Sequence, residues 1–542
     1  MKKVGVALVM VLALCLLPLS SVKAETKADV ENRLDQIEKE IAALKKEVSG
    51  QKEAWEKNMG FLKSIKLGGE VRTRWEIQNN FDFAKNNTDD FFLMRTRFSI
   101  EATPIDNLRI FIQAQDARVW GDEENGLNGW SRGGDSESQR TASDDRIDLK
   151  QGYFDLQNIG GLPVTVRVGR QVLSYGDERL VGANDWSNFG RSFDALKLII
   201  NPAEGAQVDV FYSKVVESIR DNRLDEDSDI DFYGIYGTTT NFADVGIKTF
   251  DLYALILRDN GFNNDDNEKP GVLKFPAEVD HKIKNQGNST IYTVGARMAG
   301  VIPVIEAIDY NLEYAAQYGT IGSADNYKAV KDAKGNIKKD KDGKDIYKKD
   351  GTIPSSNLNA WAVHSEVGYS MPDFMMKPRI AAFFNYATGD AVPGDKRNTT
   401  FVNLFPTNHD KYGMIDFMRW QNMQDIGGNL TITPIESLTA KIAYHRLWLA
   451  KKNDAWYGSP RRDIFFVTNA NRKGDGDNNV GDEIDLLLKY TYNKYVALEA
   501  GYSVFFAGDL VKRGGTADDG GKAIQNHKTE ANWGYVQAKI GF

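Results

Sequence analysis

Runs in which apolar and polar residues alternate recur along most of this chain. In the run VTVRVGRQ, Val164, Val166 and Val168 fall on one face, whereas Thr165 and Arg167 fall on the other. A period of two indicates a β-strand with one apolar and one polar face. Because the polar faces carry charges, which a dry protein core accepts only when they are paired, we expect the charged faces to meet water.

The alternating runs number about 18, and an even number returns an antiparallel chain to its starting side, as a closed barrel requires. Short connections such as residues 104–107 alternate with long ones such as residues 121–143, which is the asymmetry of outer-membrane barrels. We therefore predict an all-β fold, a transmembrane antiparallel β-barrel of about 18 strands. A soluble all-β protein is the alternative. The expected strands begin near Lys66, Asp90, Asp106, Asp145, Leu162, Gly190, Glu204, Ile230, Lys248, Asn288, Ala307, Asn357, Met375, Arg419, Glu436, Gly481, Lys494 and Ala531.

The first residues have the features of a secretory signal. Lys2 and Lys3 precede an apolar run from Val4 to Leu19, and small residues surround a cleavage site after Ala24. The apolar run is short for a membrane-spanning helix, so a transmembrane anchor is the weaker alternative. We predict a signal peptide over residues 1–24, a coiled-coil-like helix over residues 25–60 and an outer-membrane β-barrel over residues 61–542.

The predicted helix carries a heptad pattern of apolar residues. Their spacing is 4-3-4-3-4, which is the a/d seam of a coiled coil about three heptads long. One interpretation is a periplasmic coiled coil that sets the oligomeric state or docks a partner. The other is a helix packed on the barrel, or a spacer. The seam consists of Val30, Leu34, Ile37, Ile41, Leu44 and Val48.

Composition narrows the function classes. The only cysteine, Cys15, lies within the predicted signal, so we expect no disulfide and no thiolate metal site in the mature chain. Loss of Lys2, Lys3 and Lys23 with the signal takes the formal net charge from −8 to −11, and an acidic chain argues against nucleic-acid binding. No hydrolase or nucleotide-binding motif occurs, and we do not expect an enzyme.

Metal-binding patterns are weak. The five histidines are scattered without metal-ligand spacing, and we expect no cofactor. Asp475, Asp477, Asn479 and Glu483 resemble part of a calcium-binding loop, although Val480 stands where such a loop has its glycine. A solvated loop is the favoured interpretation, with loop-bound calcium as the alternative.

Two motif-rich stretches resemble the alginate export family of outer-membrane β-barrels. The first, residues 146–200, carries Gly169-Arg170-Gln171, Tyr175-Gly176-Asp177, Arg179-Leu180-Val181-Gly182, Trp186-Ser187-Asn188 and Gly190-Arg191-Ser192-Phe193-Asp194. The second, residues 404–426, carries Pro406-Thr407-Asn408-His409 and Tyr412-Gly413. The resemblance covers about residues 66–542 and not the N-terminal helix. It implies a channel in which a basic pathway with a few acids carries an anionic polyuronate, with Arg170, Arg179, Arg191 and Asp194 as its motif residues.

The candidate pore residues come from assigning strand faces. Rings of Arg and Lys select anions in pores, and Arg binds carboxylates in a forked geometry. For each residue, an ion-pair ladder inside the barrel is the alternative role. The predicted pore and substrate-binding residues on the wall are Arg72, Arg74, Arg95, Arg97, Arg167, Arg297, Lys441 and Lys489, with Arg109 and Lys539 on the same face. The inward acids are Glu70, Glu76, Glu101, Glu313, Glu366, Glu483, Asp485 and Glu499.

The sequence thus predicts a Gram-negative outer-membrane channel for anionic solutes or an anionic polysaccharide such as a polyuronate. A general small-solute porin and a barrel that anchors or sheathes a periplasmic complex are the alternatives. We expect the helix and the C-terminus to be periplasmic. The expected partners are outer-membrane lipid and lipopolysaccharide, the transported anion, the barrel-assembly machinery through the terminal Phe542, and a second copy or a periplasmic protein through the helix.

Overall fold

The computed structural model describes residues 27–81, 83, 88–120, 145–215, 230–259, 281–284, 287–330, 338, 346–392, 395–458, 477–512 and 528–542. The predicted signal peptide and Asp475 of the calcium-loop pattern lie outside these residues. The chain divides into two compact units, residues 1–65 and residues 66–542.

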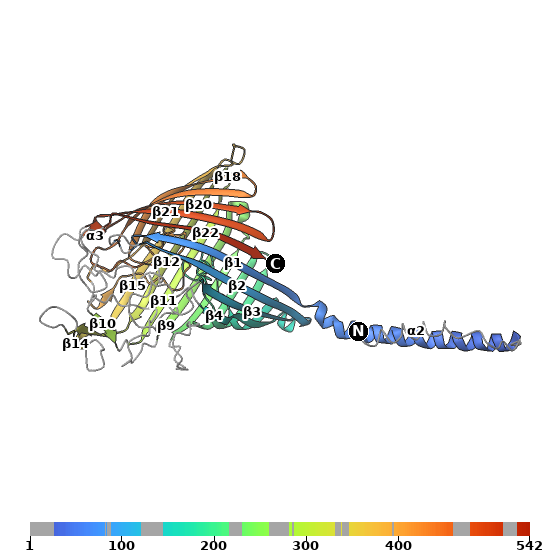
Figure 1. Ribbon diagram of the computed structural model, residues 1–542. Coiled ribbons are helices and arrows are strands. Elements are labelled where there is room, and N and C mark those ends of the chain that lie inside the picture. The colour runs from blue at the N-terminus through green and yellow to red at the C-terminus, as the bar shows by residue number, and fades with distance from the viewer. Residues whose placement is uncertain are drawn as a thin grey trace. The chain divides into compact units, whose positions relative to one another are not determined.

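The larger unit is a closed barrel of 18 antiparallel strands, which confirms the predicted fold class (Figure 1). Each strand pairs with its neighbours in chain order, and pairing of the last strand with the first closes the ring. The strands are β1 (Lys66–Asn79), β2 (Thr88–Ile105), β3 (Leu108–Val119), β4 (Asp145–Leu156), β5 (Val164–Gln171), β6 (Phe193–Ala203), β7 (Ala206–Val215), β8 (Ile230–Thr239), β9 (Ile247–Asp259), β11 (Ser289–Ile302), β12 (Ile305–Ile321), β15 (Ser356–Ser370), β16 (Arg379–Ala387), β18 (Met423–Ile435), β19 (Leu438–Trp448), β20 (Asn479–Thr491), β21 (Val496–Ala507) and β22 (Glu530–Gly541).

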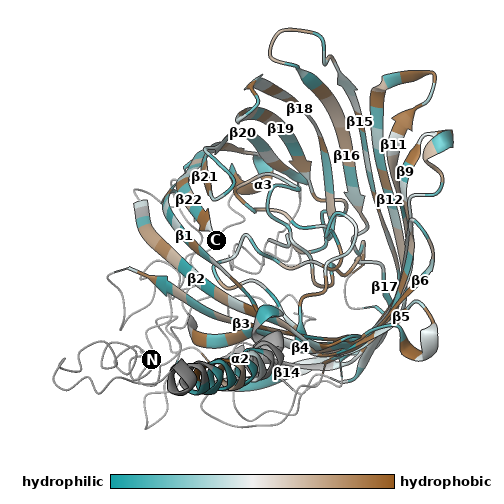
Figure 2. Ribbon diagram, turned by 90° about the vertical axis from the view of Figure 1, so that its right-hand side faces the viewer, coloured by the Kyte–Doolittle hydropathy of each residue, from teal (hydrophilic) through white to brown (hydrophobic). Residues whose placement is uncertain are grey.

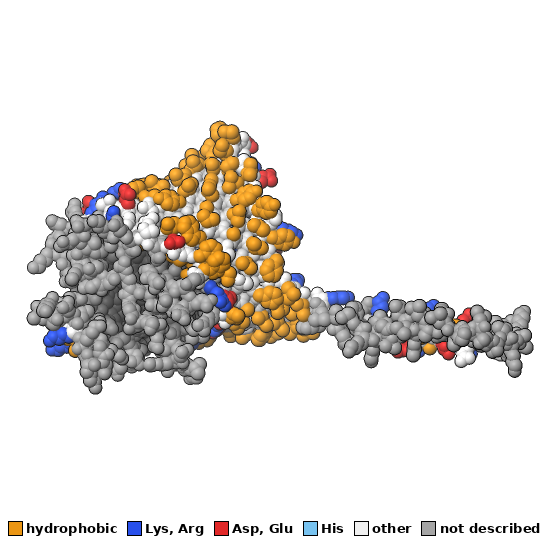
Figure 3. All heavy atoms as spheres, in the orientation of Figure 1, with side chains coloured by type: hydrophobic (Ala, Val, Ile, Leu, Met, Phe, Trp, Pro, Cys, Tyr) orange, Lys and Arg blue, Asp and Glu red, His pale blue; other side chains and the backbone are white. Residues whose placement is uncertain are grey.

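Alternation along the strands separates two environments. On β1, Trp75 is 39% exposed, whereas its neighbours Arg74 and Glu76 are buried at 1% and 3%. The apolar side chains therefore face outward, where they form the apolar surface of the barrel (Figure 3). The charged side chains of these strands, such as Arg74 and Glu76, face the interior, and two connections between strands contact inward side chains there.

Three predicted strand starts fall a few residues early. The strands expected near Gly190, Met375 and Arg419 begin at Phe193, Arg379 and Met423. The residues just before β6 and β18 belong to chain segments that lie inside the barrel. Their backbones form hydrogen bonds within those segments and do not extend the sheet. Gly190 and Asn422, for example, have backbone φ angles of 70° and 44°, which a strand does not accommodate.

The two ends of the barrel differ. Connections at the end where β1 begins and β22 finishes are short, such as residues 204–205 and 303–304, and we call it the short-turn end. The connections at the other end are long. The short strands β10 (His281–Lys284), β13 (Ala324–Ala329) and β14 (Tyr347–Ile353) form a separate three-stranded sheet there, and β17 (Arg397–Asn398) pairs in parallel with β15.

The chain terminus is part of the barrel closure. The backbone N–H of Gly69 donates to the carbonyl oxygen of Phe542 at 3.0 Å, and the N–H of Phe542 returns the bond at 3.1 Å. Gly69 has no side chain, and a Cβ at that position would lie 2.3 Å from the Phe542 ring. The terminal aromatic side chain therefore occupies space that this glycine leaves open.

The smaller unit contains the helix α2 (Lys27–Lys63), so the predicted N-terminal helix is present. Within the described residues, no helix combines the length and apolarity needed to cross a membrane. A second, short helix, α3 (Asp509–Lys512), follows β21.

Candidate functional site

Two connections fold into the barrel instead of away from it. The first inward segment, residues 172–192, joins β5 to β6, and the second inward segment, residues 399–422, joins β17 to β18. The first contacts both Arg72 of β1 and Asn311 of β12, which lie on opposite sides of the ring of strands. A segment of this length reaches both walls only by crossing the lumen, and Figure 2, a view into the barrel, shows chain segments inside the ring of strands. The two segments constrict the interior.

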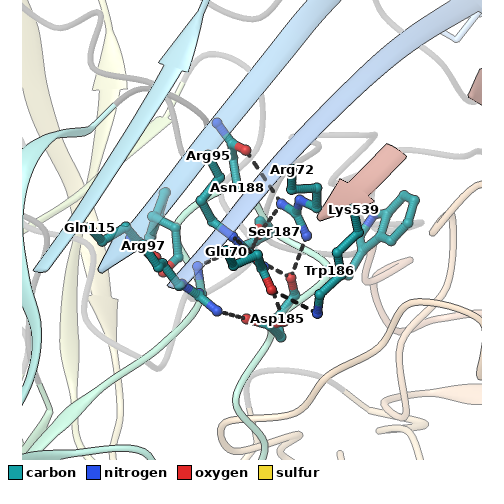
Figure 4. Close-up of polar contacts among 12 residues, drawn as sticks. Glu70, Arg72, Arg95, Arg97, Gln115, Asp185, Trp186, Ser187, Asn188 and Lys539 are labelled. Atoms are coloured by element: carbon teal, nitrogen blue, oxygen red, sulfur yellow. Dashed lines mark hydrogen bonds and ion pairs between the residues drawn. The ribbon is translucent and has the colours of Figure 1, made fainter. Parts of the chain in front are cut away.

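The arginines of β1 and β2 hold the first inward segment by its backbone. Arg72 donates to the carbonyl oxygens of Asp185 and Ser187 at 2.8 and 2.9 Å, and Arg95 donates to the same oxygens at 3.0 and 3.2 Å (Figure 4). Both side chains are buried, with exposed fractions of 4% and 0%. Both point into the lumen and bind the chain itself, while their contact with a substrate stays a prediction.

The carboxylate of Asp185 completes this cluster. It pairs with Arg97 at 2.7 Å and with Arg95 at 3.2 Å, and Glu70 pairs with Arg95 at 2.5 Å. Burial alone would raise the pKa of Asp185, but Arg95 and Arg97 outweigh burial and hold that pKa well below its usual range. Asp185 is therefore ionised throughout the physiological pH range. Strand alternation gave no sign of Asp185, because it lies in a connection.

Arg74 grips the neighbouring residue of the same segment. Its guanidinium carbon lies 3.8 Å from the ring centroid of Trp186, and it donates to the Trp186 carbonyl oxygen at 2.9 Å. Its Nε pairs with Glu76 at 2.6 Å. A desolvated cation over an indole face is a favourable contact, so Arg74 fixes both the backbone and the ring of Trp186.

Gly190 lets the first inward segment turn back to the wall. Its φ of 70° lies in the left-handed region, which strongly favours glycine. A Cβ at this position would lie 2.7 Å from Lys150 Nζ and 3.2 Å from the Ala183 carbonyl oxygen. The Asn188 amide nitrogen ties the turn to β2 and β3 by donating to the carbonyl oxygens of Met94 and Arg118.

The far wall holds the other end of the first inward segment. Asp177 pairs with Arg297 at 2.6 Å and accepts a hydrogen bond from Asn311. Burial raises the pKa of Asp177, but Arg297 and Asn311 outweigh burial and leave the pKa below its ordinary value. Arg179 lies 3.0 Å from Nε2 of His364. Because a guanidinium only donates, that imidazole nitrogen accepts, and Nδ1 carries the proton.

The two inward segments pair with each other. Val181 and Phe405 form a parallel bridge, in which Gly182 N–H donates to the Phe405 carbonyl oxygen at 2.8 Å. Arg191 donates to the carbonyl oxygens of Phe405 and Pro406 at 2.5 and 2.9 Å. Burial lowers the pKa of Arg191 to about 10, so the side chain remains charged at neutral pH. Arg191 therefore joins the two segments through neutral acceptors.

The second inward segment is anchored to walls of its own. Val402 exchanges two hydrogen bonds with the side chain of Gln317, at 2.7 and 2.8 Å. Glu483 of β20 accepts from the backbone N–H of Ile415 at 2.8 Å. Glu483 was part of the calcium-loop pattern, and the structure places it fully buried in the lumen. Among the described residues, no group of three or more His, Cys, Asp or Glu side chains is arranged to hold a metal ion.

A chain of buried polar side chains runs across five neighbouring strands. His364 Nδ1 donates to Asn385 at 2.7 Å, and Asn385 donates to Asp425 at 2.9 Å. His445 then lies 3.0 Å from Asp425 and 3.7 Å from Asp485. Sequence reasoning treated the histidines as scattered, because it considered spacing along the chain. The pattern that would have found this polar chain is the inward position of His364 and His445 on strands of one continuous series of paired strands.

The remaining predicted pore residues are in ion pairs. Each has an acidic partner on the barrel wall or on the second inward segment, so the ladder that was the alternative role is present for these side chains. The pairs are Arg167–Asp155 at 2.7 Å, Arg109–Glu101 at 2.6 Å, Lys441–Asp410 at 2.9 Å, Lys489–Glu499 at 3.3 Å and Lys539–Glu70 at 2.7 Å. Arg170 and Asp194 also pair, at 2.9 Å, but on the outer face of the barrel, because their neighbours Gln171 and Phe193 are the buried, inward residues. This corrects the prediction that Arg170 and Asp194 are pore residues.

Charge is unevenly distributed around the constriction. Within the described residues, Arg72, Lys150 and Arg191 form no ion pair, although Arg72 and Lys150 lie against the first inward segment and Arg191 belongs to it. Four buried carboxylates elsewhere on the wall form no ion pair with Lys or Arg among the described residues, and they are Glu313 on β12, Asp425 on β18, and Glu483 and Asp485 on β20. The β1–β4 wall therefore carries two cations, Arg72 and Lys150, that no carboxylate of the described residues neutralises directly.

A closed barrel with an apolar outer surface, a polar lumen and inward-folded connections defines an outer-membrane β-barrel channel. The chain belongs to the alginate export family, whose model matches residues 63–521. This confirms the resemblance seen in the two motif-rich stretches. No curated protein matches the chain.

Solved porins share the fold. OpdK of Pseudomonas aeruginosa with vanillate is 7% identical, with 89% of this chain and 99% of that chain covered and a TM-score of 0.50. A second OpdK structure is 6% identical, with the same coverage and TM-score. OccAB1 of Acinetobacter baumannii is 12% identical, with 88% and 96% covered and a TM-score of 0.49. At these identities, the likeness to OpdK concerns the barrel fold alone.

Proposed function

We propose that this outer-membrane channel prefers anions and that its substrates are anionic solutes or an anionic polysaccharide such as a polyuronate. The observation that carries the proposal is the set of Arg72, Lys150 and Arg191 around the first inward segment, without ion pairs in the described part of the chain. Uncompensated cations in a lumen attract anions and repel cations. The family to which the chain belongs is described as alginate export, which supports a polyuronate.

The anion follows the positive wall in this proposal. A linear polyanion needs successive cations along its path, and a carboxylate suits the forked geometry of arginine. The buried acids beyond this wall, among them Glu313 on β12 and Asp425 on β18, repel the polymer and keep it on the β1–β4 side. We assign no catalytic step to the channel, whose family and fold are those of transport proteins.

Ion selectivity in planar bilayers tests the proposal. At pH 5, where an amine without an acidic partner is protonated, Lys150→Gln removes one uncompensated positive charge, so the reversal potential in a salt gradient should move toward zero. Arg118→Gln is the matched control. It removes the same charge, but Arg118 pairs with Asp116 on the face opposite to Gln115, which contacts the first inward segment. Cation selectivity in the unmodified channel would defeat the proposal.

Block by oligouronates separates the two substrate classes. An exported polymer should enter the lumen and interrupt the current, whereas a neutral oligosaccharide of the same length should not. The Lys150→Gln channel should bind the oligouronate more weakly and with a shallower dependence on salt, because less electrostatic attraction remains for the salt to screen. Anion selectivity without block would leave a small-anion porin, and absence of conductance would favour the anchor or sheath.

We also propose that the short-turn end faces the periplasm. Short periplasmic turns and long external loops are usual in bacterial barrels. The first residue of β1, Lys66, and the last residue, Phe542, lie at that end, so the helix and the C-terminus would be periplasmic. Protease added outside intact cells should spare an epitope placed in residues 204–205 and cleave one placed in residues 121–143.

A further inference from the structure

The helix α2 carries an apolar stripe that is exposed in its own unit. Ile37, Ile41, Leu44 and Val48 have exposed fractions of 52%, 46%, 59% and 61%. These four are a and d positions of one heptad register, so they lie on a single face. An unpartnered apolar stripe on a long helix is a docking surface, because water contact with it is unfavourable.

The charges that flank the stripe identify what covers it. In the same register, Glu40 and Glu47 occupy g positions, and Lys45 and Lys52 occupy the e positions five residues later. In a parallel, in-register coiled coil, each g residue faces the e residue of the next heptad on the neighbouring helix. Both pairs are then Glu with Lys, and all four side chains are exposed and available. Arg33 and Glu38 continue the same complementarity in the sequence.

The barrel supplies an independent reason for a parallel arrangement. Copies of one outer-membrane barrel share one orientation in the membrane, so their helices leave it on the same side. From this geometry and from the charge pattern, we propose that α2 binds the same helix of further copies in a parallel, in-register coiled coil. Ile37 at d beside Ile41 at a favours three chains over two. The proposal is independent of the anion preference.

Cysteine cross-linking in the full-length protein tests this contact. Ile37→Cys and Leu44→Cys place identical thiols at core positions, which come within disulfide reach only if the helices are parallel and in register. Each variant should yield a covalent dimer on oxidation in membranes. Lys46→Cys is the control, because its f position lies on the outer face, and the parent chain is oxidised beside it to account for Cys15. Equal cross-linking at all three positions would overturn the proposal.

A charge exchange tests the register. Glu40→Lys with Glu47→Lys sets Lys against Lys in both Glu–Lys pairs, so the particle mass in detergent should fall to that of one chain. Adding Lys45→Glu and Lys52→Glu to the same chain restores opposite charges, and the oligomer should return. Sedimentation gives the mass as a multiple of one chain, and retained heat-modifiable migration shows that the barrel is folded. An oligomer that ignores the first exchange, or a parent protein that is monomeric, would refute the coiled coil.

Discussion

The ring of Trp186 lies flat on the imidazole of His409, with ring centroids 3.7 Å apart and planes 4° apart. Trp186 belongs to the first inward segment and His409 to the second, so the stack joins the two segments, next to Trp533 and Tyr535 of β22. Arg74 also contacts the Trp186 ring, and Asp416 lies 3.1 Å from Nδ1 of His409. Residues 223 positions apart along the chain thus form one packed unit with the wall.

Removing this stack should open the constriction. Trp186→Ala deletes the shared ring, at a cost of about 3–5 kcal/mol for a packed Trp, and leaves Arg74 without its aromatic partner. Single-channel conductance should rise, with more frequent transitions between levels. Trp75→Ala is the control, because that indole is 39% exposed on the outer face. Unchanged conductance in Trp186→Ala would mean that the stack does not limit the passage.

Loss of Arg72 should release the first inward segment without unfolding the barrel. Arg72→Met keeps most of the side-chain volume but removes the bonds to the Asp185 and Ser187 carbonyl oxygens. Each bond from a charged donor is worth about 1.5–3 kcal/mol. Proteolysis within residues 172–192 should become faster in the folded, heat-modifiable protein. Lys539→Met is the control, since Lys539 is 46% exposed in its pair with Glu70. Equal protection in both variants would contradict this anchoring role.

Gly190→Ala should destabilise the constriction by more than the backbone strain of the substitution alone. A left-handed φ costs a residue with a Cβ about 1–2 kcal/mol, and the new Cβ would also meet Lys150. Gly160→Ala is matched for strain, because Gly160 has a φ of 64° but open space around it. Thermal inactivation of conductance should therefore be faster for Gly190→Ala than for Gly160→Ala. Equal rates would show that the contact with Lys150 relaxes freely.

Asp454 should make the connection after β19 more stable in mild acid. Burial raises the pKa of its carboxyl to about 6, against hydrogen bonds from Thr400 and the Asp390 N–H that lower it. Because the pKa of Asp454 is higher in the folded state, its contribution to the free energy of unfolding is complete below the unfolded-state pKa of about 3.9. That contribution is lost as the pH rises through 6. The change amounts to about 3 kcal/mol. The measurement is the temperature at which the protein changes from folded to unfolded migration in gel electrophoresis. When the pH is lowered from 7.5 to 5, this temperature should rise by more in the wild type than in Asp454→Asn. An identical rise in both would exclude Asp454 as the source.

The sequence determined the barrel because alternation is a local property. The inward positions of Arg72, Arg74, Arg95 and Arg97 follow from a period of two, whatever the neighbouring strands are. The strand number and the helix α2 follow from similarly local patterns. Motifs in the connections further identified the family. Neither the motifs nor the alternation carries information on what the connections contact.

Only the tertiary structure decided what the inward side chains bind. Arg72 meets Asp185 at a separation of 113 residues, and Arg179 meets His364 at a separation of 185. Such contacts exist because the closed ring brings distant strands around one lumen and because two connections turn into it. Periodicity fixes the face of each residue but not its partner across the ring. The burial of the wall arginines against carbonyl oxygens is therefore a property of the closed fold.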